Sequence, residues 1–277
     1  MISSVHNSVR ILLLSLLRAF ILQITRVLHP IRLTKSKARA IEQQKINELW
    51  GNEDFVLKNV GNADRILVSN YPNCPEVEHQ VGRFLNMKKL ANEIEQLEIP
   101  GDVVEFGTWR GLGLLLLNKS FDPHKLSRQY IGIDSFEGLP ETSTVWTKGD
   151  FNNTSVEFAS KNIAKNIDAK SNFTLIKGWF SDLAVAEELY DKSRDIVLVH
   201  FDADLGSSTT QALNIIERYL EGFTHPVYFL FDDWGCHPDE VPDAFYNWIN
   251  TANIKSKICA EKISSTRFTR YYRITPV

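Results

Sequence analysis

Cysteine is scarce in this chain of 277 residues, and so is excess charge. The three cysteines, Cys74, Cys236 and Cys259, show no C-x-x-C spacing, so the sequence contains neither a disulfide framework nor a zinc-binding motif. Such usage is typical of a reducing compartment, and we expect a cytoplasmic protein. A formal net charge of −3 argues against a nucleic-acid-binding surface, so no nucleic acid is expected as a partner.

Acidic residues are absent from the first 40 positions, which contain seven basic ones. Residues 8–29 are mostly apolar, but Arg18 interrupts them, so a membrane-spanning helix is not expected. No clear cleavage site for a secretory signal follows. The spacing predicts a basic amphipathic helix, which suits either a peripheral membrane contact or packing on the protein body or a second subunit. The sequence leaves these roles and the oligomeric state open.

The remaining chain divides into two parts. Residues 41–100 are rich in helical spacing and carry no obvious chemistry. From residue 101 to 277, short apolar runs alternate with segments of helix length, which predicts parallel strands joined by crossover helices. Two final strand-like runs, at 255–263 and 267–274, are separated by only three residues and predict an antiparallel hairpin. We therefore expect an α/β fold: a doubly wound, Rossmann-like, mostly parallel sheet of seven strands with a C-terminal antiparallel hairpin.

Acidic residues stand where two of the apolar runs stop. Asp202 follows a run that ends at Phe201, and Asp232 and Asp233 follow a run that ends at Phe231. Carboxylates at the end of a hydrophobic strand are costly without a function, and ligands bind outside the carboxyl ends of such strands. Each acidic motif alone fits a turn or a helix cap equally well, but both together predict a Mg²⁺ site.

A glycine-rich turn connects the first predicted strand to the first helix, from Glu105 to Gly113. Asp134 ends the second strand 21 residues later, where a carboxylate can accept hydrogen bonds from ribose hydroxyls. Taken alone, the glycine-rich turn is explained by packing of the strand on the helix, and Asp134 by a helix cap or a turn. Together, the two features predict a nucleoside cofactor. Because Glu105 would repel a pyrophosphate and attract an amino group, S-adenosylmethionine is favoured over NAD.

Four segments together resemble the macrocin O-methyltransferase family, whose members are class I S-adenosylmethionine-dependent enzymes that methylate sugar hydroxyls of antibiotics. The segments are Val104-Glu105-Phe106-Gly107-Thr108-Trp109-Arg110-Gly111, Asp134-Ser135-Phe136-Glu137-Gly138-Leu139-Pro140, His200-Phe201-Asp202-Ala203-Asp204-Leu205 and Phe231-Asp232-Asp233-Trp234-Gly235. The resemblance covers about residues 95–250 and implies a Mg²⁺-dependent O-methyltransferase acting on a sugar or a glycosylated small molecule.

The resemblance also implies roles for individual residues. Asp202, Asp232 and Asp233 would bind Mg²⁺, and Asp202 would be the general base. The residues implied for cofactor binding are Glu105, Gly107, Thr108, Trp109, Gly111, Asp134, Ser135, Phe136, Gly178, Trp179 and Asp202. The sequence departs from the family at Gly206, where a tyrosine is common, which bears on the acceptor side of the site.

Two other classes of function stay open at this stage. One is a Rossmann-type NAD or nucleotide-sugar enzyme, which also uses a glycine-rich turn and an acidic residue. The other is a catalytically inactive, methyltransferase-like partner at a membrane, suggested by Gly206 and the amphipathic helix.

Overall fold

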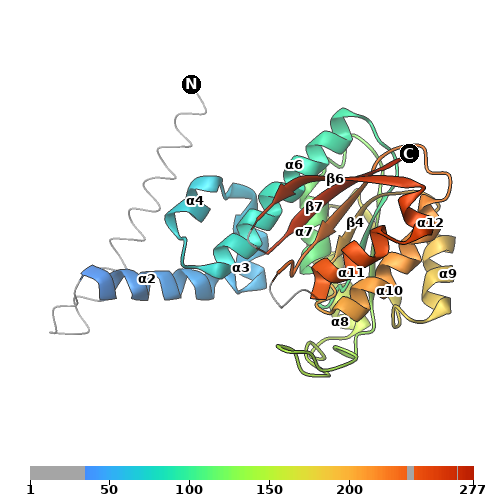
Figure 1. Ribbon diagram of the computed structural model, residues 1–277. Helices are drawn as coiled ribbons and strands as arrows, with labels where there is room; N and C mark the ends of the chain where they lie inside the picture. The colour runs from blue at the N-terminus through green and yellow to red at the C-terminus, as the bar shows by residue number, and fades with distance from the viewer. Residues whose placement is uncertain (1–34, 236–239, 267) are drawn as a thin grey trace.

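The computed structural model describes residues 35–235, 240–266 and 268–277 (Figure 1). The helix expected at residues 8–29 and Cys236 lie outside the described residues, so the expected membrane contact stays a prediction. Among the described helices, none combines the length and the apolar character that crossing a membrane requires.

A single seven-stranded sheet forms the centre of the molecule, with strand order β3-β2-β1-β4-β5-β7-β6. Its strands are β1 (Asp102–Phe106), β2 (Gln129–Asp134), β3 (Asn172–Lys177), β4 (Ile196–Phe201), β5 (Val227–Phe231), β6 (Ile258–Ser265) and β7 (Arg270–Pro276). Strands β1 to β5 pair in parallel, whereas β7 is antiparallel to both β5 and β6. The expected mostly parallel sheet and C-terminal hairpin are confirmed.

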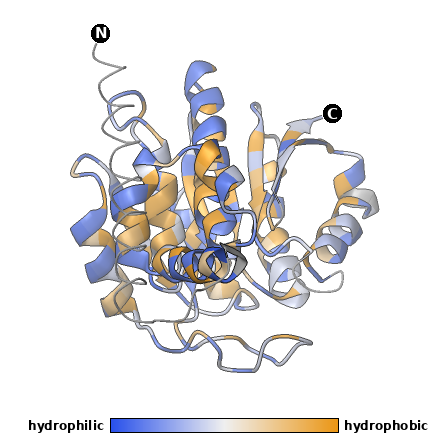
Figure 2. Ribbon diagram, turned by 90° about the vertical axis from the view of Figure 1, so that its left-hand side faces the viewer, coloured by the Kyte–Doolittle hydropathy of each residue, from blue (hydrophilic) through white to orange (hydrophobic). Residues whose placement is uncertain are grey.

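Helices cover both faces of the sheet, as the apolar composition of the strands requires. The helices that follow β1 are α7 (Leu112–Ser120), α8 (Val156–Asn166), α9 (Leu183–Lys192), α10 (Gly206–Glu217), α11 (Glu240–Ile249) and α12 (Ala252–Lys255). Alternate residues of β1 enter two cores: Val103 packs with α7, whereas Val104 and Phe106 pack with the side of the sheet covered by α9, α10 and α11. Figure 2 shows hydrophobic residues concentrated in the strands and the helices packed beside them.

Residues 35–96 form a helical region beside the sheet (Figure 1). It contains α2 (Lys35–Trp50), α3 (Glu53–Asn59), α4 (Arg65–Asn70), α5 (Pro75–Val77) and α6 (Arg83–Gln96). A π-helical turn, Glu78–Gly82, lies directly before α6. Buried residues of α6, including Phe84, Met87 and Leu90, share a core with α7, and this packing brings the start of α6 to the sheet. Single π-helical turns are frequent at functional sites.

The strand order creates a crevice at the carboxyl end of β1. Its neighbours β2 and β4 connect to opposite sides of the sheet, and ligands bind at such a switch point. Gly107 closes this point with φ +91°, and a Cβ there would lie 1.7 Å from the carbonyl oxygen of Asp202. Only glycine allows the ends of β1 and β4 to approach this closely.

Candidate active site

A cavity of about 510 Å³ opens at the carboxyl ends of the parallel strands, a volume suited to small-molecule ligands. Segments from five strand ends and from the helical region contribute to it. The predicted residues that line it are Gly107, Thr108, Trp109, Asp134, Ser135, Gly178, Trp179, Asp202 and Asp233. The structure thus brings most of the predicted residues to one place, although they span 127 positions of the chain from Gly107 to Asp233.

Four predicted residues are not part of the lining. Gly111 has φ +91° and starts α7, and Phe136 is a buried residue with φ +56°. Asp232 is 1% exposed, and Glu105 is fully buried. Gly111 and Phe136 therefore shape the backbone around the cavity, while Asp232 and Glu105 lie one layer beneath it.

Asp134 is held by backbone donors at the end of β2. Its Oδ2 accepts a hydrogen bond from the Trp109 N–H at 2.7 Å, and its Oδ1 accepts one from the Phe136 N–H at 2.6 Å. The positive φ angles of Trp109 and Phe136 belong to the turns that present these donors. Burial raises the pKa of Asp134, and the two N–H groups oppose that rise. Because each oxygen has a second lone pair, the carboxylate can still accept bonds from hydroxyl groups in the cavity.

Glu105 pairs with His200 across two parallel strands. The register sets the two residues opposite each other, and Oε1 of Glu105 lies 3.0 Å from Nδ1 of His200. Oε2 is buried and has no hydrogen-bond partner among the described residues. Gly113, which lines the cavity, lies directly above: a Cβ there would be 2.0 Å from Oε1. Oε1 thus fills the space that a side chain of residue 113 would take, and the unpaired Oε2 is an acceptor that suits an ammonium group.

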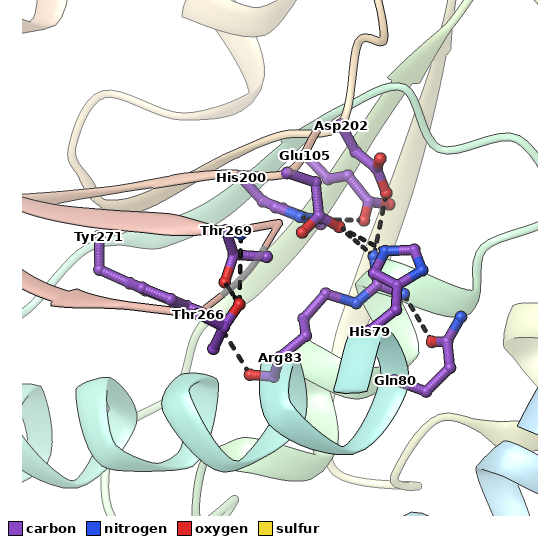
Figure 3. Close-up of polar contacts among 10 residues, drawn as sticks. His79, Gln80, Arg83, Glu105, His200, Asp202, Thr266, Thr269 and Tyr271 are labelled. Atoms are coloured by element: carbon purple, nitrogen blue, oxygen red, sulfur yellow. Dashed lines mark hydrogen bonds and ion pairs between the residues drawn. The ribbon is translucent and has the colours of Figure 1, made fainter. Parts of the chain in front are cut away.

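Asp202 and Asp232 both contact the guanidinium of Arg83. Figure 3 shows the Arg83 side chain extending toward Asp202. Nη1 of Arg83 donates to Oδ2 of Asp202 at 3.3 Å and also to Oδ2 of Asp232. Nε2 of His79 lies 3.5 Å and Nε2 of His200 lies 3.4 Å from the same Asp232 oxygen. Three nitrogen groups therefore surround one carboxylate oxygen.

This arrangement sets the ionisation of the cluster. Burial alone would raise the pKa of Asp232, but the Arg83 guanidinium and the two histidines hold it well below its usual range. Burial would lower the pKa of His200, but its contacts with Asp232 and Glu105 raise it to about 10. Burial and the charges of Asp202 and Asp232 raise the pKa of Asp233 to about 7.

The side chains as they lie do not fit the expected Mg²⁺ site. A Mg²⁺ ion binds oxygen at about 2.1 Å, so an ion on Oδ2 of Asp232 would overlap the Arg83 guanidinium. Oδ1 of Asp232 is buried without a hydrogen-bond partner among the described residues, but Asp232 lies beneath the cavity and is not part of its lining. Within the described residues, the ligand atoms that gather within 4.8 Å belong to Glu105, His200 and Asp202, a set that leaves out two of the three expected ligands, Asp232 and Asp233.

Sequence reasoning missed the contribution of residues 41–100, for which no chemistry was expected. His79, Gln80 and Arg83 all line the cavity. The sequence does contain a signal: polar residues spaced three and four apart occur among the apolar positions Val77, Val81 and Phe84 of one helical stretch. A buried charged residue in such a stretch implies a partner of opposite charge.

Gly206 has a packing explanation. A Cβ at this position would lie 2.7 Å from the carbonyl oxygen of Glu240 at the start of α11, so no larger side chain fits. The neighbouring Asp204 does not cap the following helix, since the cap position of α10 is Leu205, without a side-chain hydrogen bond. Asp204 instead lines the cavity with φ +57°.

Comparison with known proteins agrees with this geometry. The Macrocin-O-methyltransferase (TylF) family profile matches residues 14–270. The 8-demethyl-8-(2,3-dimethoxy-alpha-L-rhamnosyl)-tetracenomycin-C 4'-O-methyltransferase of Streptomyces olivaceus is 24% identical over 219 residues, covering 74% of this chain and 80% of that protein. The demethyldecarbamoylnovobiocin O-methyltransferase of Streptomyces niveus is 23% identical over 172 residues, covering 57% of this chain and 62% of that protein.

Two solved structures share the fold. The O-methyltransferase NovP has a TM-score of 0.53 at 21% identity, covering 70% of this chain and 79% of that chain. The calicheamicin methyltransferase CalS11 has a TM-score of 0.53 at 17% identity, covering 88% of this chain and 94% of that chain. The match over most of the sequence confirms the resemblance: the chain belongs to the macrocin O-methyltransferase family and is an S-adenosylmethionine-dependent O-methyltransferase.

Proposed function

We propose that this chain transfers the methyl group of S-adenosylmethionine to a hydroxyl of a sugar or of a glycosylated small molecule. The observation that carries the proposal is the single cavity that joins Asp134 and Gly107 at the cofactor end to Asp202 and Asp233. Holding two reactants in one cavity supplies much of the acceleration of a transfer reaction. The printed names of two relatives, which act on a rhamnosyl tetracenomycin and on a novobiocin precursor, support a sugar-bearing acceptor.

In this proposal the cofactor lies along the carboxyl ends of β1, β2 and β3. Asp134 accepts hydrogen bonds from the ribose hydroxyls with the lone pairs that Trp109 and Phe136 leave free. Glu105, whose Oε1 lies against Gly113, receives the amino group of the methionine part on its unpaired Oε2. Residues that border the remaining cofactor are Thr108, Ser135, Gly178 and Trp179.

Asp202 is the proposed general base. Its side chain is 28% exposed and faces the cavity, whereas that of Asp232 is fully buried. As the acceptor oxygen attacks, its proton passes to the Asp202 carboxylate, a C–O bond forms, and the S–C bond breaks with its electron pair on sulfur. Burial and the charge of Asp232 raise the pKa of Asp202, which strengthens it as a proton acceptor. No step of the proposal passes through a metal ion; the Mg²⁺ dependence expected from the sequence stays a prediction that the position of Arg83 does not favour.

Replacing Asp202 by asparagine tests this role. We expect Asp202→Asn to lower turnover of a rhamnoside acceptor by about 10²–10⁴-fold while S-adenosylmethionine affinity stays close to wild type, because most of the expected cofactor contacts come from other strands. Asp191→Asn, on the exposed side of α9, is the matched control. Radiolabelled methyl transfer and calorimetric cofactor titration are the measurements. A large loss of cofactor affinity in Asp202→Asn would show that the site is misassigned.

The alternatives predict different outcomes in the same assays. The family match over residues 14–270 does not support the first alternative, an NAD or nucleotide-sugar enzyme. Cofactor binding without methyl transfer to any sugar acceptor, with Mg²⁺ present, would favour the inactive, membrane-associated partner. The packing of Gly206 against Glu240 removes one reason for that second alternative. The membrane contact of residues 8–29 and the oligomeric state stay predictions.

A further inference from the structure

Arg83 is a buried cation with no role in the methyl transfer proposed above. Its side chain is 4% exposed, and its guanidinium contacts the carboxylates of Asp202 after β4 and Asp232 after β5. Carboxylates gathered at strand ends need positive charge nearby, since burying them unpaired is costly. Here that charge comes from the first residue of α6, in the helical region.

Several contacts hold the guanidinium in this position. Nη2 of Arg83 donates to Oε1 of Gln80 at 2.9 Å, in the π-helical turn that precedes α6. The Tyr271 hydroxyl of β7 donates to the Arg83 carbonyl oxygen at 3.3 Å. Asn86 extends the link, because its Nδ2 donates to the Gly82 carbonyl and its Oδ1 accepts from the Ser264 hydroxyl of β6. The start of α6 is therefore fixed to the β6–β7 hairpin, and the cation is positioned before any ligand binds.

The planar guanidinium of Arg83 can hold the two carboxylates together, as a bound metal ion would otherwise do. One nitrogen reaches Asp202 and Asp232 together, while the other is held by Gln80. Arginine presents five donors in a rigid fork and stays charged under all working conditions. It can thus hold Asp202 toward the cavity and also offset the negative charge of the cluster.

We propose that Arg83 is the resident cation of this active site, a positioning residue that holds Asp202 for proton transfer and makes methyl transfer independent of a divalent metal ion. The inference rests on the proposed function, with Asp202 as the base. Arg83 itself exchanges no proton: the acceptor proton goes to Asp202, and the methyl group moves from sulfur to oxygen. The reaction needs no further reactant.

Metal titration tests the inference without any assay of activity. Mn²⁺ is the probe, and its binding is followed by electron paramagnetic resonance of the full chain. We expect wild-type protein and Arg83→Lys to bind no stoichiometric Mn²⁺, because both keep a cation among the carboxylates. Arg83→Ala removes the cation, and we expect it to bind Mn²⁺ at least about tenfold more tightly than wild type. Lys88→Ala, an exposed position of the same helix, should behave as wild type.

Methyl-transfer assays supply the second readout. Wild-type turnover should be unchanged in EDTA, and Arg83→Ala should lose turnover and regain part of it with added Mn²⁺. Stoichiometric Mn²⁺ binding by wild type as tight as that of Arg83→Ala, or loss of wild-type turnover in EDTA with recovery in Mg²⁺, overturns the inference. If Arg83→Ala does not fold, the wild-type titration and Arg83→Lys still decide it. If no sugar acceptor is methylated although the cofactor binds, the proposed function fails. The Mn²⁺ titration still decides whether Arg83 takes the place of a divalent ion among the carboxylates.

Discussion

Gly107→Ala is the substitution whose effect can be worked out most directly from the structure. The new Cβ would lie 1.7 Å from the Asp202 carbonyl oxygen, at least about 1.5 Å inside contact distance. Because the nearest atom is backbone, no side-chain rotation relieves the overlap. Overpacking of this kind costs about 1–3 kcal/mol, and an L-residue at positive φ costs about 1–2 kcal/mol. We therefore expect the free energy of unfolding to fall by about 2–5 kcal/mol.

A matched control separates the two contributions. Gly222 also has positive φ, at +75°, but a Cβ there meets nothing within 4 Å. Gly222→Ala should therefore show the backbone cost alone, about 1–2 kcal/mol. Urea unfolding followed by circular dichroism measures both variants, and the slope of each transition checks that the same surface is exposed. An equal loss of stability in Gly107→Ala and Gly222→Ala would refute the close approach of β1 and β4.

The same substitution should affect the reaction. The ends of β1 and β4 must separate to admit the methyl group, and this moves Asp202 away from the cofactor. A displacement of about 1 Å of a reacting group can cost about 10²-fold in rate. We expect turnover of folded Gly107→Ala to fall by about that factor, and that of Gly222→Ala to stay at wild type in the same radiolabelled assay.

Three further predictions follow from individual contacts. Asp134→Asn should weaken S-adenosylhomocysteine binding by about 10–100-fold in calorimetry, since a hydrogen bond to a charged group contributes about 1.5–3 kcal/mol; unchanged affinity would place the ribose elsewhere. The pKa of His200, about 10 in the folded chain, exceeds its unfolded value of about 6.5, so its stabilisation is complete below pH 6.5 and is lost as the pH rises toward 10. Urea unfolding across that range should show a steeper fall for wild type than for His200→Gln, and parallel curves would count against a charged His200. Gly206→Ala should lower stability by about 1–3 kcal/mol, because its Cβ would meet the Glu240 carbonyl at 2.7 Å; a stability gain, as expected for alanine in an open helix, would contradict that packing.

The sheet could be predicted because its signal is local. The apolar runs ending at Phe201 and Phe231 became strands with the same final residues. Fully buried strands are apolar on both faces, so the end of each run marks the end of a strand. The short link between the last two runs likewise predicted the β6–β7 hairpin.

The cofactor half of the cavity could be predicted for a related reason. In a parallel sheet, residues that follow different strands meet at one edge, so Gly107, Asp134 and Gly178 come together once the strands are identified. The burial of Glu105 beneath Gly113 could not be predicted, because it depends on how closely α7 packs on β1. Periodicity predicts which face of a helix is buried, but it does not predict how far the helix lies from a strand.

The positively charged partner of the carboxylates lies far from them in the sequence. Arg83 is 119 residues from Asp202 and 149 residues from Asp232 in the sequence, and no local pattern connects them. The sequence by itself determined the strands, their ends and the carboxylates that follow them, since hydrophobic periodicity and turn residues act over a few positions. Only the packing of α6 against α7 and the β6–β7 hairpin decided that a guanidinium meets those carboxylates, because electrostatic pairing depends on distances that exist only in the folded chain.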